Sequence, residues 1–306
     1  MRSGWRSDGV LVYPGEPGSF AEEAARAAGG DAAAPLGVAG FREVFADVSA
    51  GRAGRGDGAE ARVLGGVLPI ENVLGGTVRE TYDLLLEHDL QIVGEVIVPV
   101  HLCLAALPGQ RLEAIERVYS HVQALAQAER FLRTRPWALL TTYNTAAAGR
   151  MVAERAERGS AAVLSPRGAA TYGLEVLADG IEDAPDDRTR FLVVAPAGGW
   201  TPAGAGIGPA ASDRPMRTTL VVGLANEPGS LARALGVLAA GGLNMSKLES
   251  RPLPGRAWQY VFWIDLDADA GEPRTAEALA HLRRAVSFMR ILGTYPQATR
   301  KDAVDP

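Results

Sequence analysis

Short apolar runs alternate with helical patterns along the N-terminal two thirds of the chain, and this order constrains the fold more than any other feature. The first run, residues 10–13, leads through a Gly- and Pro-rich turn into an Ala- and Glu-rich helix pattern at 21–28. Further apolar runs lie at 63–70, 91–104, 117–119, 161–164 and 191–194. Strands that alternate with helices predict an α/β fold. Because such runs are typical of strands buried on both faces, we expect mainly parallel sheets.

Three helix starts carry capping patterns. Segments 77–80 and 120–123 read Thr-x-x-Glu and Ser-x-x-Gln, the spacing of a capping box. The pair Asn-Thr at 144–145 is expected to cap a helix over 146–158, with Gly159 as its stop. Helix N-termini attract anions because their first N–H groups are free and the helix dipole is positive there. These starts are therefore candidate carboxylate sites, although capping alone is the usual role of such residues.

The C-terminal third has a different order of elements. Residues 195–215 contain Gly, Pro and Ala without periodicity, which predicts a linker. After it we expect a strand at 216–224, a helix at 230–240, strands at 243–251 and 257–266, a helix at about 275–289 and a strand at 291–295. This βαββαβ order predicts a separate ferredoxin-like unit.

Composition and charge exclude several classes of protein. The 306 residues carry a formal net charge of −5, which gives no bulk attraction to nucleic acid or to an anionic membrane. The N-terminus lacks a signal-peptide pattern, and no apolar run approaches the roughly 20 residues that span a bilayer. We therefore expect a cytoplasmic protein with no nucleic-acid or membrane partner. The single cysteine, Cys103, excludes an intrachain disulfide and suits a reducing compartment.

The sequence carries no metal or cofactor signature. The four histidines lie without ligand spacing at positions 88, 101, 121 and 281. Neither a G-x-G-x-x-G fingerprint nor a P-loop occurs. We therefore expect no cofactor and no metal.

Five motifs follow one another in the N-terminal two thirds. They are GEPGSF at 15–20, PIEN at 69–72 followed by GTV at 76–78, SHVQ at 120–123 followed by Gln127, NTAAA at 144–148, and TRF at 189–191. In this order they resemble the prephenate dehydratase family. The resemblance implies a lyase of phenylalanine biosynthesis that converts prephenate to phenylpyruvate, with loss of carbon dioxide and the ring hydroxyl and without a cofactor.

Two C-terminal motifs resemble the ACT domain attached to these enzymes. They are Gly229-Ser230-Leu231 at a predicted helix start and Glu249-Ser250-Arg251-Pro252 at a strand end. With Asn244, these residues are implied to bind phenylalanine as an allosteric ligand at the interface of a homodimer or homotetramer. The alternative is that Gly229 only starts a helix and Arg251 only forms a surface ion pair.

The resemblance also implies roles for individual residues. Thr189 would be the general acid, with the neighbouring Arg190 raising the local positive potential. The other catalytic residues would be Asn72, Ser120, Gln127 and Glu71. The substrate-binding residues would be Ser19, Phe20, Gly76, Thr77, His121, Thr145, Arg190 and Phe191.

Several of these residues keep a second interpretation. Thr189 taken alone would be the first residue of a strand. Glu71 either contacts substrate or organises its neighbours, and Gln127 faces either the cleft or solvent. His121 is favoured as a structural residue over a base.

Four positions depart from the family pattern, where Ser, Pro, Ser and Asn are usual. They are Val73, Val122, Asn144 and Asp187. Asp187 matters most, because a carboxylate near a dianionic substrate should repel it unless Arg188 or Arg190 neutralises it.

The motifs and element order together predict an α/β catalytic unit with two lobes, resembling periplasmic-binding-protein architecture, and a ferredoxin-like ACT domain. We expect a catalytic domain at 9–197, a linker at 198–215 and the ACT domain at 216–297. One lobe would comprise about 9–90 with 173–197, and the other 91–172. The TRF motif would then face the PIEN motif across the cleft.

Two other functions stay open. One is a dehydratase for arogenate or another prephenate analogue, and the other is a catalytically inactive homologue that senses ligands. A periplasmic transport protein is disfavoured by the missing signal peptide.

Overall fold

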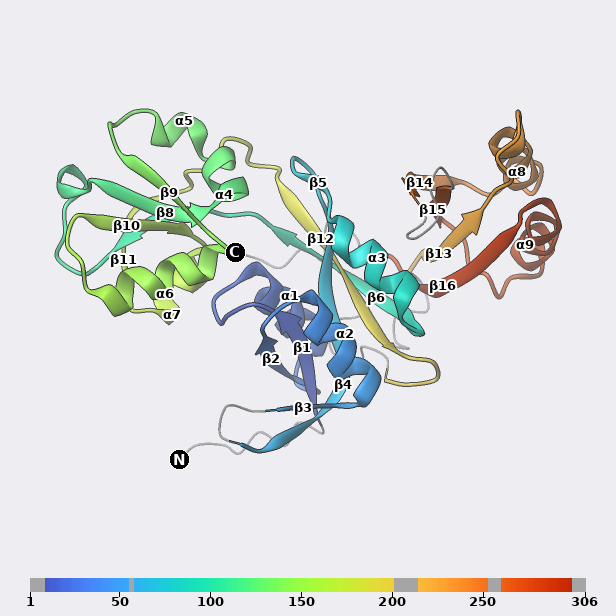
Figure 1. The fold of residues 1–306 in the computed structure, drawn as a ribbon, viewed down its shortest axis with the longest axis horizontal. Coiled ribbons are helices and arrows are strands. Elements are labelled where there is room, and N and C mark those ends of the chain that lie inside the picture. The colour runs from blue at the N-terminus through green and yellow to red at the C-terminus, as the bar shows by residue number, and fades with distance from the viewer. Residues whose placement is uncertain (1–8, 55–57, 201–213, 253–259, 299–306) are drawn as a thin grey trace.

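Three β-sheets with flanking helices make up the protein, as Figure 1 shows. The structure is a computed structural model, and it describes residues 9–54, 58–200, 214–252 and 260–298. In Figure 1 the second sheet lies at the left, the first in the centre and the third at the right. None of the helices in the described ranges is long and apolar enough to cross a membrane.

The first sheet forms the core of one lobe, in the order β2-β1-β4-β12-β6. Its strands are β1 (Val10–Pro14), β2 (Ala34–Val38), β4 (Glu60–Asn72), β6 (Leu90–Pro99) and β12 (Arg188–Pro196), with short β3 (Arg52–Gly54) and β5 (Gly76–Thr77) beside β4. The helices of this lobe are α1 (Phe20–Gly29), α2 (Phe41–Ala50) and α3 (Arg79–Glu87).

The second sheet forms the core of the other lobe, in the order β11-β7-β10-β8-β9. Its strands are β7 (Cys103–Ala106), β8 (Arg117–His121), β9 (Ala138–Thr142), β10 (Ser160–Leu164) and β11 (Glu175–Asp179). The helices of this lobe are η1 (Leu112–Ala114), α4 (Val122–Gln127), α5 (Glu129–Leu132), α6 (Thr145–Arg155) and α7 (Pro166–Thr171).

The predicted fold class is confirmed, but two of its details are wrong. The sheets are mixed rather than mainly parallel, because β12 runs antiparallel to both β4 and β6, and β7 runs antiparallel to β10 and β11. The lobe boundaries also move. The apolar run at 91–104 contains two strands that belong to different sheets, so the chain changes lobe at 100–102 and returns at 180–187. Because the strands before and after this crossover are both apolar, the hydropathy of the sequence does not show where the chain passes between lobes.

The helix starts were predicted with mixed success. The side chain of Asn144 caps α6 by accepting from the N–H of Ala147 at 2.6 Å, as expected. The two capping boxes are wrong. Thr77 pairs with Glu71 in the β4–β5 hairpin, and α3 begins after Val78. Ser120 lies in β8 and does not cap a helix. The residue that caps α4 is His121.

The third sheet belongs to the C-terminal unit and has the order β14-β15-β13-β16, with every pair antiparallel. Its elements are β13 (Met216–Gly223), α8 (Ser230–Ala240), β14 (Met245–Pro252), β15 (Tyr260–Leu266), α9 (Pro273–Ala285) and β16 (Phe288–Pro296). The predicted βαββαβ order is confirmed. The second helix is shorter than expected, because Val286 is extended and Phe288 already pairs with Gly223.

The C-terminal unit packs directly on the first lobe. Its helices α8 and α9 cover one face of its sheet, while the other face shares a buried core with the first lobe. Trp263 meets Tyr82 of α3 edge to face, with ring centroids 4.7 Å apart. A Cβ atom at Gly293 of β16 would collide with the carbonyl oxygen of Ile92 in β6. The two units therefore meet through close backbone packing as well as side chains.

Candidate active site

A cavity of about 540 Å³ lies between the two lobes of the N-terminal unit. The first lobe lines it with residues from the ends of β1 and β4, the start of β12, and the starts of α1, α2 and α3. The second lobe contributes residues from α4 and from the start of α6. The size suits a small organic acid, and the carboxyl ends of strands are where α/β proteins bind ligands.

Asn72, the last residue of β4, is the centre of the polar wall of this cavity. Its Nδ2 donates to Asp187 Oδ1 at 2.9 Å and to Thr189 Oγ1 at 3.1 Å. Its Oδ1 accepts from the amides of Gln123 at 3.1 Å and Gln127 at 3.4 Å. The side chain is 7% exposed, so these contacts fix its orientation. Both lobes thus meet at one buried amide.

Thr189 lies beside Asn72 on the neighbouring strand β12. The register pairs these two residues directly. The expectation that the TRF and PIEN motifs face each other across the cleft is therefore wrong, because β12 and β4 belong to one sheet. From the other lobe, Gln123 and Gln127 of α4 contact Asn72 beside Thr189. Since Thr189 Oγ1 accepts from Asn72, its own proton is left to donate into the cavity.

Asp187 lies behind this polar wall and is 1% exposed. It accepts from Asn72 through Oδ1 and from Gln127 Nε2 through Oδ2, the latter at 2.6 Å. Burial raises the pKa of its carboxyl above the usual 3.8, although these hydrogen bonds oppose the shift. Asp187 is not among the described residues that line the cavity, so its carboxylate lies one layer behind the surface where the sequence suggested a charge near the substrate. It orients two amides that do line the cavity.

Four helices of nine to eleven residues begin at the cavity: α1, α2, α3 and α6. Ser19 and Asn144 cap α1 and α6 with their side chains. Gly40 and Val78, the N-cap residues of α2 and α3, make no side-chain capping bond within the described chain. Their helices therefore present free N–H groups to an anion. Arg79, in the first turn of α3, is the one arginine or lysine among the described lining residues.

His121 lines the cavity from the start of α4. Its Nδ1 accepts from the N–H of Gln123 at 3.3 Å, which assigns the proton of the neutral ring to Nε2. Burial lowers the pKa of the imidazole below the usual 6.5. At neutral pH this side chain is therefore a hydrogen-bond donor without charge.

The cavity brings together eight of the thirteen catalytic and substrate-binding residues predicted from the sequence. Those that line it are Ser19, Phe20, Asn72, His121, Gln127, Thr145, Thr189 and Phe191. Gly76 and Thr77 form β5 and are not among the lining residues, whereas the next three residues are.

Three predicted site residues are not among the described residues that line the cavity, and their contacts lie elsewhere. Ser120 is fully buried and donates to the carbonyl oxygen of Val163 at 2.6 Å. Glu71 and Arg190 form an ion pair at 2.8 Å on the far side of the sheet. Each precedes or follows a cavity residue by one position, and successive strand residues face opposite sides.

Sequence reasoning missed several lining residues. Arg79 and Glu80 lie in the first turn of a predicted helix, so the same argument that selected helix starts could have found them. Gln123 was present in a quoted motif but was given no role. Phe41 and Tyr143 follow no motif, and only the tertiary structure brings them to the cavity.

The predicted regulatory residues lie at the start of α8, in the turn before β14 and in β14 of the C-terminal unit. Gly229 caps α8 with φ 80°, a left-handed conformation that favours glycine, and the hydroxyl of Ser230 accepts from Arg233 at 3.1 Å. Asn244 donates to Asp267 at 2.6 Å. Leu231 lies in α8, and Glu249, Ser250 and Pro252 lie in β14. Arg251 is 12% exposed and pairs with Asp83 of α3 at 2.8 Å, so it bridges the two units.

Family models match most of the chain. The model described as prephenate dehydratase matches residues 11–198, and the model described as ACT domain matches residues 218–283. Arogenate dehydratase 5 from Arabidopsis thaliana is 38% identical over 305 residues, which cover 94% of this chain and 67% of the relative. The bifunctional chorismate mutase/prephenate dehydratase of Aquifex aeolicus is 35% identical, with 94% and 74% covered.

The chain spans 56% to 67% of the length of three plant arogenate dehydratases that it matches. Among solved structures, prephenate dehydratase from Arthrobacter aurescens in complex with L-Phe has a TM-score of 0.79 at 31% identity, and 97% of this chain and 92% of that chain are covered. A protein described as a novel type of quorum quenching acylase has a TM-score of 0.81 at 32% identity, with 95% and 99% covered.

Proposed function

Because the chain belongs to the prephenate dehydratase family and carries an ACT domain, we propose that it is a lyase that converts prephenate to phenylpyruvate in the cavity between its lobes. The observation that carries the proposal is the contact between Asn72 Nδ2 and Thr189 Oγ1 at 3.1 Å on the cavity wall. It supplies a hydroxyl on the cavity wall whose oxygen already accepts a hydrogen bond, which leaves its proton available for the substrate. The reaction belongs to the biosynthesis of phenylalanine.

The chemistry needs one proton for a departing hydroxide. The electron pair of the bond between the ring and its carboxylate enters the ring as carbon dioxide leaves. The opposite C–O bond breaks, the hydroxide takes the proton of Thr189 and departs as water, and the ring becomes aromatic. The Thr189 oxygen gains negative charge during the transfer, and the Asn72 amide stabilises that charge. Solvent then returns the proton to Thr189.

The net charge of the protein is negative, so the two carboxylates of prephenate must be bound by local groups in the cavity. The starts of α2 and α3 offer free N–H groups, and Arg79 adds a full positive charge at the same end of the cavity. Phe20, Phe41 and Phe191 provide apolar surface for the ring. Held in this way, the ring hydroxyl would be presented to Thr189 with little freedom to turn.

Arogenate is the second candidate substrate, and Glu80 favours it. Arogenate carries an ammonium group where prephenate has a keto group. Glu80 is the one carboxylate among the described residues lining the cavity, and it could pair with that ammonium. Five similar plant proteins are named arogenate dehydratase, and two more are named arogenate dehydratase/prephenate dehydratase.

An acylase is a weaker candidate. Acyl transfer needs a nucleophile with a base in hydrogen-bond reach. His121 is the natural base in the cavity, but its Nδ1 already accepts from the backbone of Gln123. The support is the name of one similar structure.

One assay separates these candidates. The purified chain is incubated with prephenate, with arogenate and with an N-acyl amide, and aromatic product or released amine is measured. We expect prephenate to give the higher kcat/KM, and Glu80→Gln to reduce kcat/KM for arogenate more than for prephenate. Aromatic product from neither cyclic substrate would refute the proposal and leave the ligand-sensing alternative.

Phenylalanine is the ligand we propose for the ACT domain, held at Gly229, Ser230, Leu231, Asn244 and residues 249–252. The similar structure described with L-Phe supports it. Gly229→Val would force a branched side chain into a left-handed conformation, and calorimetry should then show weaker phenylalanine binding than in the intact protein. Equal binding by both would contradict this site.

The remaining assignments are also proposals. They are the domain bounds 9–197, 198–215 and 216–297, a cytoplasmic location, and assembly as a homodimer or homotetramer. The ion pair between Arg251 and Asp83 of α3 gives the ACT domain a direct contact through which it can affect the catalytic unit.

A further inference from the structure

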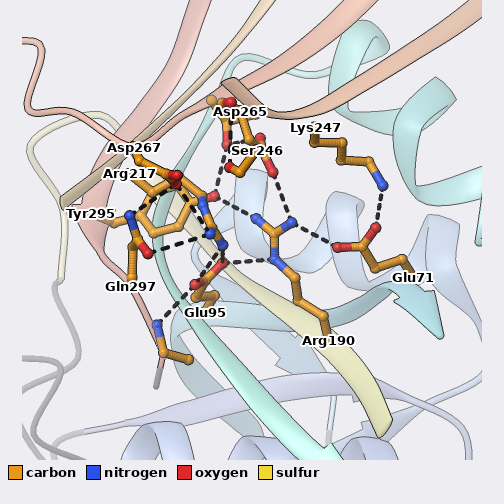
Figure 2. A network of polar contacts seen from close by, with 12 residues as sticks. Glu71, Glu95, Arg190, Arg217, Ser246, Lys247, Asp265, Asp267, Tyr295 and Gln297 are labelled. Atoms are coloured by element: carbon orange, nitrogen blue, oxygen red, sulfur yellow. Dashed lines mark hydrogen bonds and ion pairs between the residues drawn. The ribbon is translucent and has the colours of Figure 1, made fainter. Parts of the chain in front are cut away.

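The reverse side of the cavity wall carries a buried ion network, shown in Figure 2. Its centre is Arg190, whose side chain is 12% exposed. The guanidinium contacts Glu95 at 2.7 Å, Glu71 at 2.8 Å, Asp265 at 2.8 Å and the hydroxyl of Tyr295 at 3.1 Å. Asp265 and Tyr295 belong to the C-terminal unit, so one side chain ties three strands of the first lobe to two strands of that unit.

Further charges extend the same network. Lys247 of β14 contacts the second oxygen of Glu71. Arg217 of β13 contacts Glu95 at 2.8 Å, and Glu95 has no exposed side-chain surface. Burial would raise the pKa of Glu71, but Arg190 and Lys247 outweigh it and hold that pKa below the usual 4.5. Glu71 is therefore charged at neutral pH and keeps both partners.

The register connects this network to the cavity. Thr189 pairs with Asn72, and in the next position Arg190 pairs with Glu71. Successive residues of a strand face opposite sides of the sheet. Thr189 and Asn72 lie on the cavity side, and each is the chain neighbour of a residue, Arg190 or Glu71, that the C-terminal unit contacts. The ladder between β12 and β4 is irregular between Arg190 and Phe191, and such irregularities set the direction of neighbouring side chains.

We propose that Arg190 and Glu71 are positioning residues through which the C-terminal unit sets the placement of Thr189 and Asn72 in the cavity. Asp265 and Lys247 hold these two side chains from the other unit. A shift of the C-terminal unit moves the end of β4 and the start of β12 and so alters the donor geometry at Thr189. The inference rests on the proposed role of Thr189, because its functional consequence is a change in proton donation. It acts on turnover rather than on substrate binding.

The test changes a residue that lies outside the cavity. Asp265→Asn keeps the shape of the side chain but removes its charge from Arg190, and Lys247→Gln is a second variant at the edge strand β14. The matched control is Arg290→Gln. Arg290 also joins the two units, but it donates to the carbonyl oxygens of Leu85 and His88 at 3.3 and 2.8 Å, at the end of α3.

We expect Asp265→Asn to lower kcat about 10-fold with KM within about twofold, and Lys247→Gln to lower kcat about threefold. Arg290→Gln should leave kcat within about twofold even where it lowers Tm as much as Asp265→Asn does. Equal kcat in Asp265→Asn and Arg290→Gln would overturn the proposal, because loss of stability alone would then explain both.

A second measurement needs no substrate. The N–H groups of Leu74 and Gly75 donate to Asn72 Oδ1 at 3.1 and 2.6 Å, so their hydrogen exchange reports the placement of Asn72. We expect faster exchange there in Asp265→Asn than in Arg290→Gln. If the wild-type chain turns over neither prephenate nor arogenate but exchange responds in this way, the proposed function fails and the coupling stands. An active wild type whose exchange is the same in both variants would overturn the coupling alone.

Discussion

Asn72→Asp is the substitution that probes the cavity wall most sharply. It preserves shape but replaces the donor Nδ2 by a carboxylate oxygen, which removes the hydrogen bonds to Asp187 Oδ1 and Thr189 Oγ1. The new oxygen would lie at the present 2.9 Å from Asp187. At that separation and an effective dielectric constant of about 20, two unit charges repel by about 6 kcal/mol.

The protein will avoid most of this repulsion by binding a proton between the two carboxylates. The pKa of the introduced group in the folded state is then raised above its unfolded value of about 3.9. The loss of stability is therefore greatest above the raised pKa, and it is relieved as the pH falls through that pKa. With the shared proton taken into account, we expect Asn72→Asp to lower the free energy of unfolding by about 2 to 4 kcal/mol at pH 8. This difference from wild type should shrink toward pH 5.

Two measurements check this expectation. Urea unfolding at pH 5 to 8 should give a stability difference from wild type that narrows as the pH falls. Turnover at pH 8 should drop about 100- to 1,000-fold, because the hydrogen bond that stabilises the Thr189 oxygen is gone. Asn144→Asp is the control: it also adds a carboxylate to the cavity, but it remains a good N-cap and should keep its stability. A pH-independent stability difference for Asn72→Asp, or unchanged turnover, would refute the described wall.

Three further predictions follow from other contacts. Arg79→Gln should raise KM for prephenate about 10-fold with little change in kcat, and the effect should weaken in high salt; a KM that is unchanged at low salt would remove Arg79 from carboxylate binding. Gly293→Ala should lower the free energy of unfolding by about 1 to 3 kcal/mol, because its Cβ meets the Ile92 carbonyl, and thermal unfolding that matches wild type would show that the two units do not pack this closely. Glu71 has a pKa held below 4.5 by Arg190 and Lys247, so it contributes stability above that pH that is lost as the pH falls through its folded-state pKa; acid unfolding of Glu71→Gln should lack this component.

The sequence predicted the polar residues of the cavity better than it predicted their neighbours. Asn72, Thr189 and Gln127 were placed in the cavity because they belong to motifs, and the structure brings them together. Glu71 and Arg190 belong to the same motifs but face the other side of the sheet. The alternation of strand residues could have divided each motif into two faces. What it could not reveal is that the second face contacts the C-terminal unit.

Asp187 shows a second limit of sequence reasoning. A carboxylate two residues before Thr189 reads as a charge near the substrate, since position along the chain says nothing about depth. In the structure it is buried behind Asn72 and Gln127 and orients their amides. The lobe boundaries failed for a related reason: β6 and β7 form one apolar run, and hydropathy does not mark where a chain passes from one sheet to another.

The central claim is that the hydroxyl of Thr189 protonates the departing hydroxide, and the turnover of prephenate by Thr189→Ala and Thr189→Ser tests it most directly. With the hydroxyl removed, kcat should fall about 100- to 10,000-fold while KM changes by a few-fold at most. Thr189→Ser keeps the hydroxyl beside Asn72 and should stay within about 10-fold of wild type. A folded Thr189→Ala variant that turns over prephenate as fast as the wild type would contradict the claim.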